Sequence, residues 1–281
     1  MNSLADFLRF IRFSHTVFAL PFAMGAMFVA ARGLPPLPVF AGILAAMVCA
    51  RTAAMTFNRL ADWEFDRRNP RTKNRHRLVD KNVAAAWCLA SSAGFIFSAW
   101  TLNTLCLLLA PTALAIVFFY SLTKRFTHFA HFFLGLALSV APVGAWIAVT
   151  GRLDFPPLVL AAAVLLWVAG FDLIYATQDC EADKREGLHS MVVRLGEGGA
   201  MKLAVWLHVA ALAGLAGFGF AAGAGNIYFA SLAIIAAALV YEHLEARRGD
   251  VNSINRAFFR ANAIVGAAFV AGTFFDHLAP A

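Results

Sequence analysis

Nine long apolar runs divide the sequence and decide what it can fold into. They cover residues 13–31, 38–57, 83–101, 104–121, 131–149, 157–175, 200–221, 227–243 and 258–277. Runs of about 20 apolar residues are long enough to cross the hydrocarbon core of a bilayer as α-helices, and a helix satisfies its backbone hydrogen bonds internally. The pattern predicts an all-α, polytopic membrane protein with nine transmembrane helices.

The composition supports this fold class. Hydrophobic residues make up 61% of the 281-residue chain and charged residues 14%, whereas about 25% of the residues in an ordinary soluble domain are charged. The net charge of +7 does not indicate nucleic acid, because the basic residues gather in the connections between apolar runs. Membrane orientation and contacts with anionic lipid account for that placement. We therefore expect membrane lipid as a partner, and no nucleic acid.

The basic residues are distributed unequally between the two sides of the predicted helices. One side carries Arg9 and Arg12, eight Lys or Arg residues from Arg59 to Lys81, Lys124 and Arg125, the segment from Lys184 to Lys202, and the segment from Arg247 to Arg260. The other side carries Arg32 and Arg152. Because basic connections stay in the cytoplasm, we predict a cytoplasmic N-terminus, an external C-terminus and a bacterial-type inner (plasma) membrane.

Two acidic repeats stand where the second and sixth apolar runs end. The first joins Asn58, Asp62 and Asp66, and the second joins Asp179 and Asp183, each at intervals of four residues. On a helix, residues four apart share one face. Carboxylates at a membrane edge are costly unless they are neutralised, and Mg²⁺ binds one or two carboxylates together with substrate phosphates. The five residues therefore predict a Mg²⁺ and diphosphate site in a membrane enzyme that acts on a phosphorylated lipid.

The two halves of the chain share this organisation. Long cytoplasmic connections, from about 59 to 82 and from about 176 to 199, each open with an acidic repeat and continue into a basic segment. We expect each connection to carry a short helix that caps the site. The chain reads as a single domain over residues 1–281, with pseudo-repeat halves of about 1–125 and 126–281.

Basic side chains supply the expected complement to a metal-bound diphosphate. Lys and Arg donate charge-assisted hydrogen bonds to phosphate oxygens. The candidates for diphosphate binding are Arg71, Arg75, Lys124, Arg125 and Lys184. Arg51 lies inside an apolar run, where an arginine indicates a function and an acidic partner nearby. Tyr120 and Lys124 share one helical face at a membrane edge, as a Y-x-x-x-K pair.

The first acidic repeat (N-x-x-x-D-x-x-x-D), the Y-x-x-x-K pair and the second acidic repeat (D-x-x-x-D) stand in this order at helix ends. This arrangement resembles the UbiA superfamily of intramembrane prenyltransferases. The resemblance covers essentially the whole chain. Matching features outside the motifs are Arg12, Arg51, Arg71-Thr72, Arg75 and Tyr175-Ala176. The segments Phe13–Phe22 and Gly187–Ser190 look like the quinone-pathway branch of the superfamily. Arg59 and His76-Arg77 depart from its usual pattern, which leaves the acceptor open.

The resemblance implies a nine-helix bundle with a central cavity open sideways to lipid. It also implies Mg²⁺-dependent transfer of a polyprenyl group from polyprenyl diphosphate to an aromatic acceptor, 4-hydroxybenzoate or a related dihydroxynaphthoate, in ubiquinone or menaquinone biosynthesis. The catalytic candidates are Asp62, Asp66, Asp179, Asp183, Arg51, Tyr120 and Lys124. Either Arg12 or Arg51 is available for an acceptor carboxylate.

Two alternatives remain at this point. Within the superfamily, the acceptor could be haem, chlorophyllide, homogentisate or a glycerol phosphate lipid. Outside it, the acids could line the ion path of a transporter. Transporters usually carry such acids near the bilayer midplane, on broken helices, whereas these acids lie at helix ends beside basic connections. The placement favours the enzyme.

Overall fold

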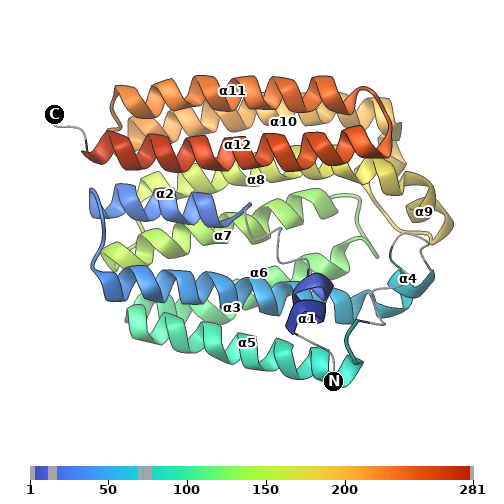
Figure 1. Cartoon of the computed structure of the whole chain (residues 1–281), viewed down its shortest axis with the longest axis horizontal. Helices are drawn as coiled ribbons and strands as arrows, with labels where there is room; N and C mark the ends of the chain where they lie inside the picture. The colour runs from blue at the N-terminus through green and yellow to red at the C-terminus, as the bar shows by residue number, and fades with distance from the viewer. Residues whose placement is uncertain (1–3, 12–17, 69–71, 73–77, 279–281) are drawn as a thin grey trace.

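The computed structural model describes residues 4–11, 18–68, 72 and 78–278, and every regular element among them is helical (Figure 1). In the first half of the chain these are α1 (Leu4–Phe10), α2 (Leu20–Ala31), α3 (Leu37–Ala61), α4 (Trp63–Arg68), α5 (Lys81–Leu102) and α6 (Thr104–Thr123). In the second half they are α7 (Ala130–Thr150), α8 (Phe155–Ala176), the 3₁₀ turn η3 (Thr177–Asp179), α9 (Cys180–Arg185), α10 (Met191–Ala222), α11 (Asn226–Ala246) and α12 (Val251–Leu278).

The all-α membrane architecture is confirmed. Within the described ranges, eight helices are long and apolar enough to cross a bilayer, namely α3, α5, α6, α7, α8, α10, α11 and α12. The shorter apolar helix α2 corresponds to the first predicted span, of which residues 13–17 lie outside the described part of the chain. Eight spans and α2 together account for the nine predicted helices.

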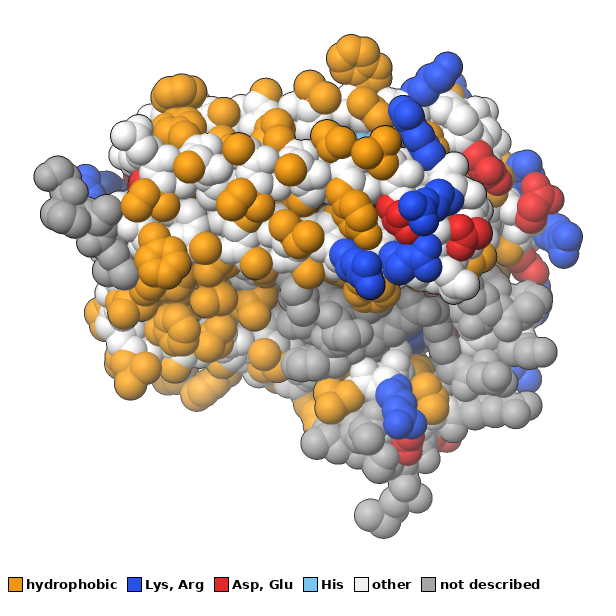
Figure 2. Space-filling view, turned by 45° about the horizontal axis from the view of Figure 1, so that its top comes forward, with side chains coloured by type: hydrophobic (Ala, Val, Ile, Leu, Met, Phe, Trp, Pro, Cys, Tyr) orange, Lys and Arg blue, Asp and Glu red, His pale blue; other side chains and the backbone are white. Residues whose placement is uncertain are grey.

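The helices lie side by side as a bundle, and α8 is its most buried member. Leu160, Val164, Trp167, Val168 and Phe171 of α8 are all nearly inaccessible, and α8 packs against α7 on one side and α10 on the other. The pairs α3 with α5 and α11 with α12 also pack closely, and α2 contacts both α7 and α12. The outer helices present apolar side chains outward, as Figure 2 shows over one face. Such a surface suits lipid as a solvent.

Asn103 decides where α5 ends and α6 begins, the boundary that the apolar pattern marks least clearly. Its backbone is extended (φ −167°, ψ 170°), and its side-chain oxygen accepts a hydrogen bond from the Cys106 amide at 2.9 Å. Its Nδ2 donates to the Ile147 carbonyl of α7 at 2.9 Å. An asparagine cap satisfies an amide at the start of a helix, and here it also ties the connection to a neighbouring helix.

Both acidic repeats lie at one end of the bundle, where the short helices α4 and α9 follow α3 and α8 (Figure 1). The prediction of a short helix in each long connection is therefore confirmed. α12 ends at the opposite end of the bundle (Figure 1). The division of the single domain into pseudo-repeat halves, about 1–125 and 126–281, stays a prediction.

Neither acidic repeat lies on one uninterrupted helix, and this corrects the sequence-based expectation. α3 ends before Asp62, whose φ of −94° and ψ of 16° leave the helical region, and α8 passes through a 3₁₀ turn before α9 begins. The break moves Asp66 into the first turn of α4 and Asp183 into the first turn of α9. Carboxylates are unfavourable at a helix C-terminus and favourable at an N-terminus, which is a physical reason for the interruption.

Candidate active site

The two acidic repeats line one polar cavity of about 260 Å³ at the motif end of the bundle. Side chains from α3, α4, α6, α8 and α9 all reach it. The sequence-predicted residues among its lining are Asn58, Asp62, Asp66, Tyr120, Lys124, Arg125, Asp179 and Asp183. Residues that are far apart in the sequence thus converge, as a shared Mg²⁺ and diphosphate site requires. We call Asn58, Asp62 and Asp66 the first half-site, and Asp179 and Asp183 the second half-site.

In the first half-site, neighbouring side chains neutralise the negative charge of the two aspartates only in part. Asn58 Nδ2 donates to Asp62 Oδ2 at 3.2 Å, and Arg125 Nη2 lies 3.6 Å from Asp62 Oδ1. The buried Arg59 pairs with Asp66, with Nη1 3.2 Å from Oδ2. Burial, followed by the charge of Asp66, raises the pKa of the Asp62 carboxyl, and the nearby arginines only partly offset this. A cation placed beside Asp62 would relieve the same repulsion.

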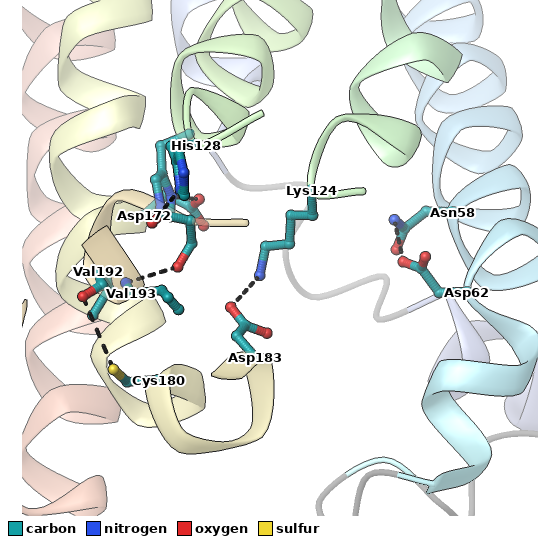
Figure 3. A network of polar contacts seen from close by, with 11 residues as sticks. Asn58, Asp62, Lys124, His128, Asp172, Cys180, Asp183, Val192 and Val193 are labelled. Atoms are coloured by element: carbon teal, nitrogen blue, oxygen red, sulfur yellow. Dashed lines mark hydrogen bonds and ion pairs between the residues drawn. The ribbon is translucent and has the colours of Figure 1, made fainter. Parts of the chain in front are cut away.

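The second half-site is organised around Lys124. Its Nζ lies 3.3 Å from Asp183 Oδ2, and its carbonyl accepts the His189 amide at 2.7 Å. Burial alone would lower the pKa of Lys124, but the carboxylates of Asp183, Asp172 and Asp179 outweigh burial and raise it. In Figure 3, Lys124 extends from α6 toward Asp183, and Asn58 and Asp62 lie on its other side. Lys124 therefore stands between the two half-sites.

An apolar cavity of about 280 Å³ adjoins the polar one. It is lined by α3, α5, α6 and α7, and Tyr120 and Leu134 line both cavities. Arg51 also lines the apolar cavity, and its buried Nε has no hydrogen-bond partner among the described residues. The arrangement offers a hydrocarbon-lined space next to a charged one, with Arg51 and Tyr120 near their junction.

One predicted diphosphate ligand, Lys184, does not line the cavity, and two others lie outside the described residues. Lys184 pairs with Glu181 at 3.1 Å on the exposed side of α9 and is not part of the lining. Arg71 and Arg75 lie outside the described residues, as does Arg12, one of the two candidates for an acceptor carboxylate. Their neighbour Thr72 is described and buried, and its Oγ1 donates to the Asp66 carbonyl at 2.9 Å.

The donor set fits Mg²⁺ that is shared with a substrate. Among the described residues, no three His, Cys, Asp or Glu side chains come close enough together to enclose a metal ion by themselves. Mg²⁺ seldom uses such a cage, because it retains waters and binds one or two carboxylates plus substrate phosphates. Hard carboxylate oxygens on opposite sides of one cavity, with Lys124 between them (Figure 3) and Arg125 beside Asp62, meet that requirement.

Several polar residues at this site have no predicted role. Arg59 departs from the usual pattern of the superfamily, yet it pairs with Asp66. Arg68 Nη1 of α4 lies 3.6 Å from Oε2 of Glu186, just after α9, so an ion pair joins the two short helices. Asp172, one turn before Tyr175 and in register with the second repeat, lines the polar cavity and pairs with His131 of α7. Its helical register was the only signal in the sequence, and nothing there pointed to His131.

Comparisons with known proteins place the chain in a family. Its sequence matches the UbiA prenyltransferase family over residues 19–264. It is 32% identical to the 4-hydroxybenzoate octaprenyltransferase of Methylococcus capsulatus over 260 residues, which cover 91% of this chain and 88% of the relative. It is 31% identical to that of Nitrosospira multiformis over 256 residues, which cover 90% of this chain and 87% of the relative.

The fold agrees with solved structures. A UbiA homologue from Aeropyrum pernix K1, in its apo form, superposes with a TM-score of 0.85 and 34% identity, covering 94% of this chain and 98% of the homologue. A UbiA homologue from Archaeoglobus fulgidus bound to GPP and Mg²⁺ shares the fold with a TM-score of 0.73 and 22% identity, covering 98% of this chain and all of the homologue (100%). The chain is thus an integral membrane prenyltransferase that belongs to the UbiA prenyltransferase family.

Proposed function

We propose that this protein transfers a polyprenyl group from polyprenyl diphosphate to a ring carbon of 4-hydroxybenzoate or a related dihydroxynaphthoate, with Mg²⁺ as cofactor, in ubiquinone or menaquinone biosynthesis. One observation carries the proposal. Both acidic half-sites, with Lys124 and Arg125, line a polar cavity that meets an apolar cavity at Tyr120. A prenyl diphosphate has the same two parts, a charged head and a hydrocarbon tail. The relatives named 4-hydroxybenzoate octaprenyltransferase support the aromatic acceptor.

The residues of the polar cavity would hold the diphosphate. Asn58, Asp62 and Asp66 on one side, and Asp179 and Asp183 on the other, are the proposed ligands of Mg²⁺. When bound, Mg²⁺ neutralises the diphosphate and makes it a better leaving group. Lys124 and Arg125 would exchange their present carboxylate partners for diphosphate oxygens and stabilise the charge that develops there.

The apolar cavity would hold the prenyl chain and keep water away from the reacting carbon. Exclusion of water protects an allylic cation from hydrolysis. As the bond from the first prenyl carbon to the diphosphate oxygen breaks, the ring carbon ortho to the hydroxyl attacks that prenyl carbon. The ring then loses the proton at that carbon to the released diphosphate and regains aromaticity. Arg51, whose buried Nε has no hydrogen-bond partner among the described residues, is available to an acceptor carboxylate.

The test is a product analysis. Membranes that contain the protein are incubated with labelled polyprenyl diphosphate and Mg²⁺, in the presence of hydroxybenzoates, dihydroxynaphthoates, homogentisate or a glycerol phosphate lipid. Membranes without the protein are the control. We expect a protein-dependent product whose mass equals a hydroxybenzoate or dihydroxynaphthoate plus the prenyl group, minus one hydrogen. A product formed only with one of the other acceptors would refute the aromatic assignment.

A further inference from the structure

His131 and Asp172 form a buried pair beside the polar cavity, outside the acidic repeats. His131 of α7 is fully buried, with 0% exposure, and its Nδ1 lies 2.6 Å from Asp172 Oδ2. Within the described ranges this is the only hydrogen bond of the Asp172 side chain. The other ring nitrogen of His131, Nε2, is buried and has no partner there.

The hydrogen bond fixes which ring nitrogen of His131 carries the hydrogen. An ionised carboxylate only accepts hydrogen bonds, so Nδ1 donates to Asp172. A histidine that donates an N–H to a carboxylate orients that carboxylate, as the outer partners of metal ligands do. His131 therefore holds one oxygen of Asp172 and leaves the other available to the cavity.

Asp172 occupies a different depth from the proposed metal ligands. It precedes Asp179 on the chain by seven residues, or roughly 10 Å along a helix, and α8 approaches the motif end from the other end of the bundle. Its side chain is 22% exposed and lines the polar cavity together with Tyr120 and Leu134. Those two residues also line the apolar cavity. The charge of Asp172 acts on Tyr120, which lines both cavities. We therefore place Asp172 near the junction of the two cavities, where the first carbon of a bound prenyl chain would lie.

The electrostatic surroundings agree with this position. Asp172 is one of three carboxylates that raise the pKa of Lys124, so its charge acts on the cation that would hold the leaving diphosphate. Figure 3 shows Asp172 on the side of the site opposite Asn58 and Asp62. One oxygen of Asp172 is engaged with His131. A ligand at the junction would therefore meet a single oriented carboxylate oxygen.

We propose that Asp172 accepts a hydrogen bond from the ring hydroxyl of the aromatic acceptor, and that His131 is the positioning residue that holds Asp172 for this purpose. The inference rests on the proposed function and deepens it. A hydroxyl that donates to a carboxylate gains electron density on oxygen, which activates the ortho ring carbon toward the allylic cation. The same contact selects for acceptors with a hydroxyl, because an analogue without the hydrogen leaves the carboxylate unpaired.

The test compares acceptors and variants in matched membranes. His131→Leu removes the donor to Asp172, and His131→Asn restores an N–H at nearly the same place. Asp172→Asn replaces the carboxylate that accepts the hydrogen bond and leaves His131 intact. This variant tests the proposal if His131→Leu fails to fold. Ser139→Ala is the control, because Ser139 is also a buried polar residue of α7, with Oγ bonded to the Leu136 carbonyl, and lines neither cavity.

For each protein, kcat/KM is measured with the hydroxylated acceptor, together with the KM for polyprenyl diphosphate, the Mg²⁺ concentration for half activity, and inhibition by the methyl ether of the acceptor. We expect His131→Leu to lower kcat/KM for the acceptor about 10- to 100-fold, the usual effect of losing such an orienting partner, and His131→Asn to recover most of it. The KM for the diphosphate, the Mg²⁺ requirement and inhibition by the methyl ether should stay as in the wild type. Asp172→Asn should lose the preference for hydroxyl over methoxy.

Several results would overturn the inference. Unchanged acceptor kinetics in His131→Leu and Asp172→Asn would do so, as would equal weakening of the hydroxylated acceptor and its methyl ether. A shift confined to the Mg²⁺ requirement would instead make Asp172 a metal ligand. If the wild-type protein modifies no acceptor with a ring hydroxyl, the proposed function fails and this inference fails with it. If the wild type is active and the variants match it, only this inference fails.

Discussion

Lys124 Nζ lies 3.3 Å from Asp183 Oδ2, although the two residues are 59 positions apart. The ion pair joins the end of α6 to the first turn of α9 and so links the Y-x-x-x-K motif to the second acidic repeat. Both side chains line the polar cavity. The lysine is held next to the proposed metal ligands before any substrate arrives. A bound diphosphate would then replace the Asp183 carboxylate as the anionic partner of Lys124.

Replacing this lysine tests its role toward the diphosphate. Lys124→Met should reduce prenyl transfer about 10²- to 10³-fold, the usual loss when one donor to a developing anion is removed. The measurement is product formation per unit of protein at saturating substrates. Lys202→Met, which changes an exposed lysine of α10, is the matched control and should keep wild-type activity. Equal activity of the two variants would contradict the role of Lys124.

The carboxylates can be tested against acidic neighbours in the same two motif segments. Asp62→Ala and Asp183→Ala should each lower turnover by at least about 10²-fold, because metal stabilisation of the transition state is worth several kcal/mol. Glu64 and Glu181 lie within the same repeats, but their side chains are 64% and 73% exposed. Glu64→Ala and Glu181→Ala should therefore remain close to wild type. The decisive quantity is the rate at equal protein level, and comparable losses in all four variants would show that the repeats act only as general negative charge.

Metal removal should abolish the reaction reversibly. Without a divalent cation, the acids of the two half-sites and the diphosphate repel each other in one cavity. Excess EDTA should stop product formation, and added Mg²⁺ or Mn²⁺ should restore it. Full activity in excess chelator would rule out the metal-dependent mechanism.

Asp62 should lower the stability of the metal-free protein at neutral pH. Its pKa is raised in the folded protein, chiefly by burial and then by Asp66. The folded state therefore binds the proton more tightly than the unfolded state, and this group's contribution favours folding more as the pH falls toward and below its folded pKa. Asp62→Asn should raise the midpoint of thermal unfolding at pH 7 in EDTA, and the gain should shrink as the pH falls. A lower midpoint for Asp62→Asn at pH 7 would contradict this account of the site.

Thiol labelling can check the orientation of the bundle. Single cysteines introduced at the exposed positions Arg68 and Lys184 should react with a membrane-impermeant reagent only from the cytoplasmic side. One at Arg152, whose side chain is 76% exposed, should react only from outside. The parent protein is the blank, because Cys88 and Cys180 are buried and Cys49 and Cys106 are partly buried within apolar helices. If positions 68 and 184 react from opposite sides, the two repeats do not share a site.

The sequence predicted the helix positions closely wherever the thickness of the bilayer fixes the length of a helix. The run at residues 104–121 became α6, and the run at 131–149 became α7, because a bilayer fixes the length of apolar helix that can cross it. The prediction was less accurate where polar residues continue a helix beyond the apolar run. The run at 200–221 belongs to α10, which begins earlier, at Met191, and has a kink at Gly196 with φ 70°.

The fold class, the approximate helix positions and the acidic residues at two helix ends all follow from the sequence alone. These are local properties, set by hydrophobic length and by helical spacing. Three pairings depend on how the chain packs: Arg59 with Asp66, Lys124 with Asp183, and His131 with Asp172. Periodicity shows which residues share a face of one helix, but not which helix packs against that face. The last two pairs cross between helices, and Arg59 and Asp66 meet only because the chain turns at Asp62.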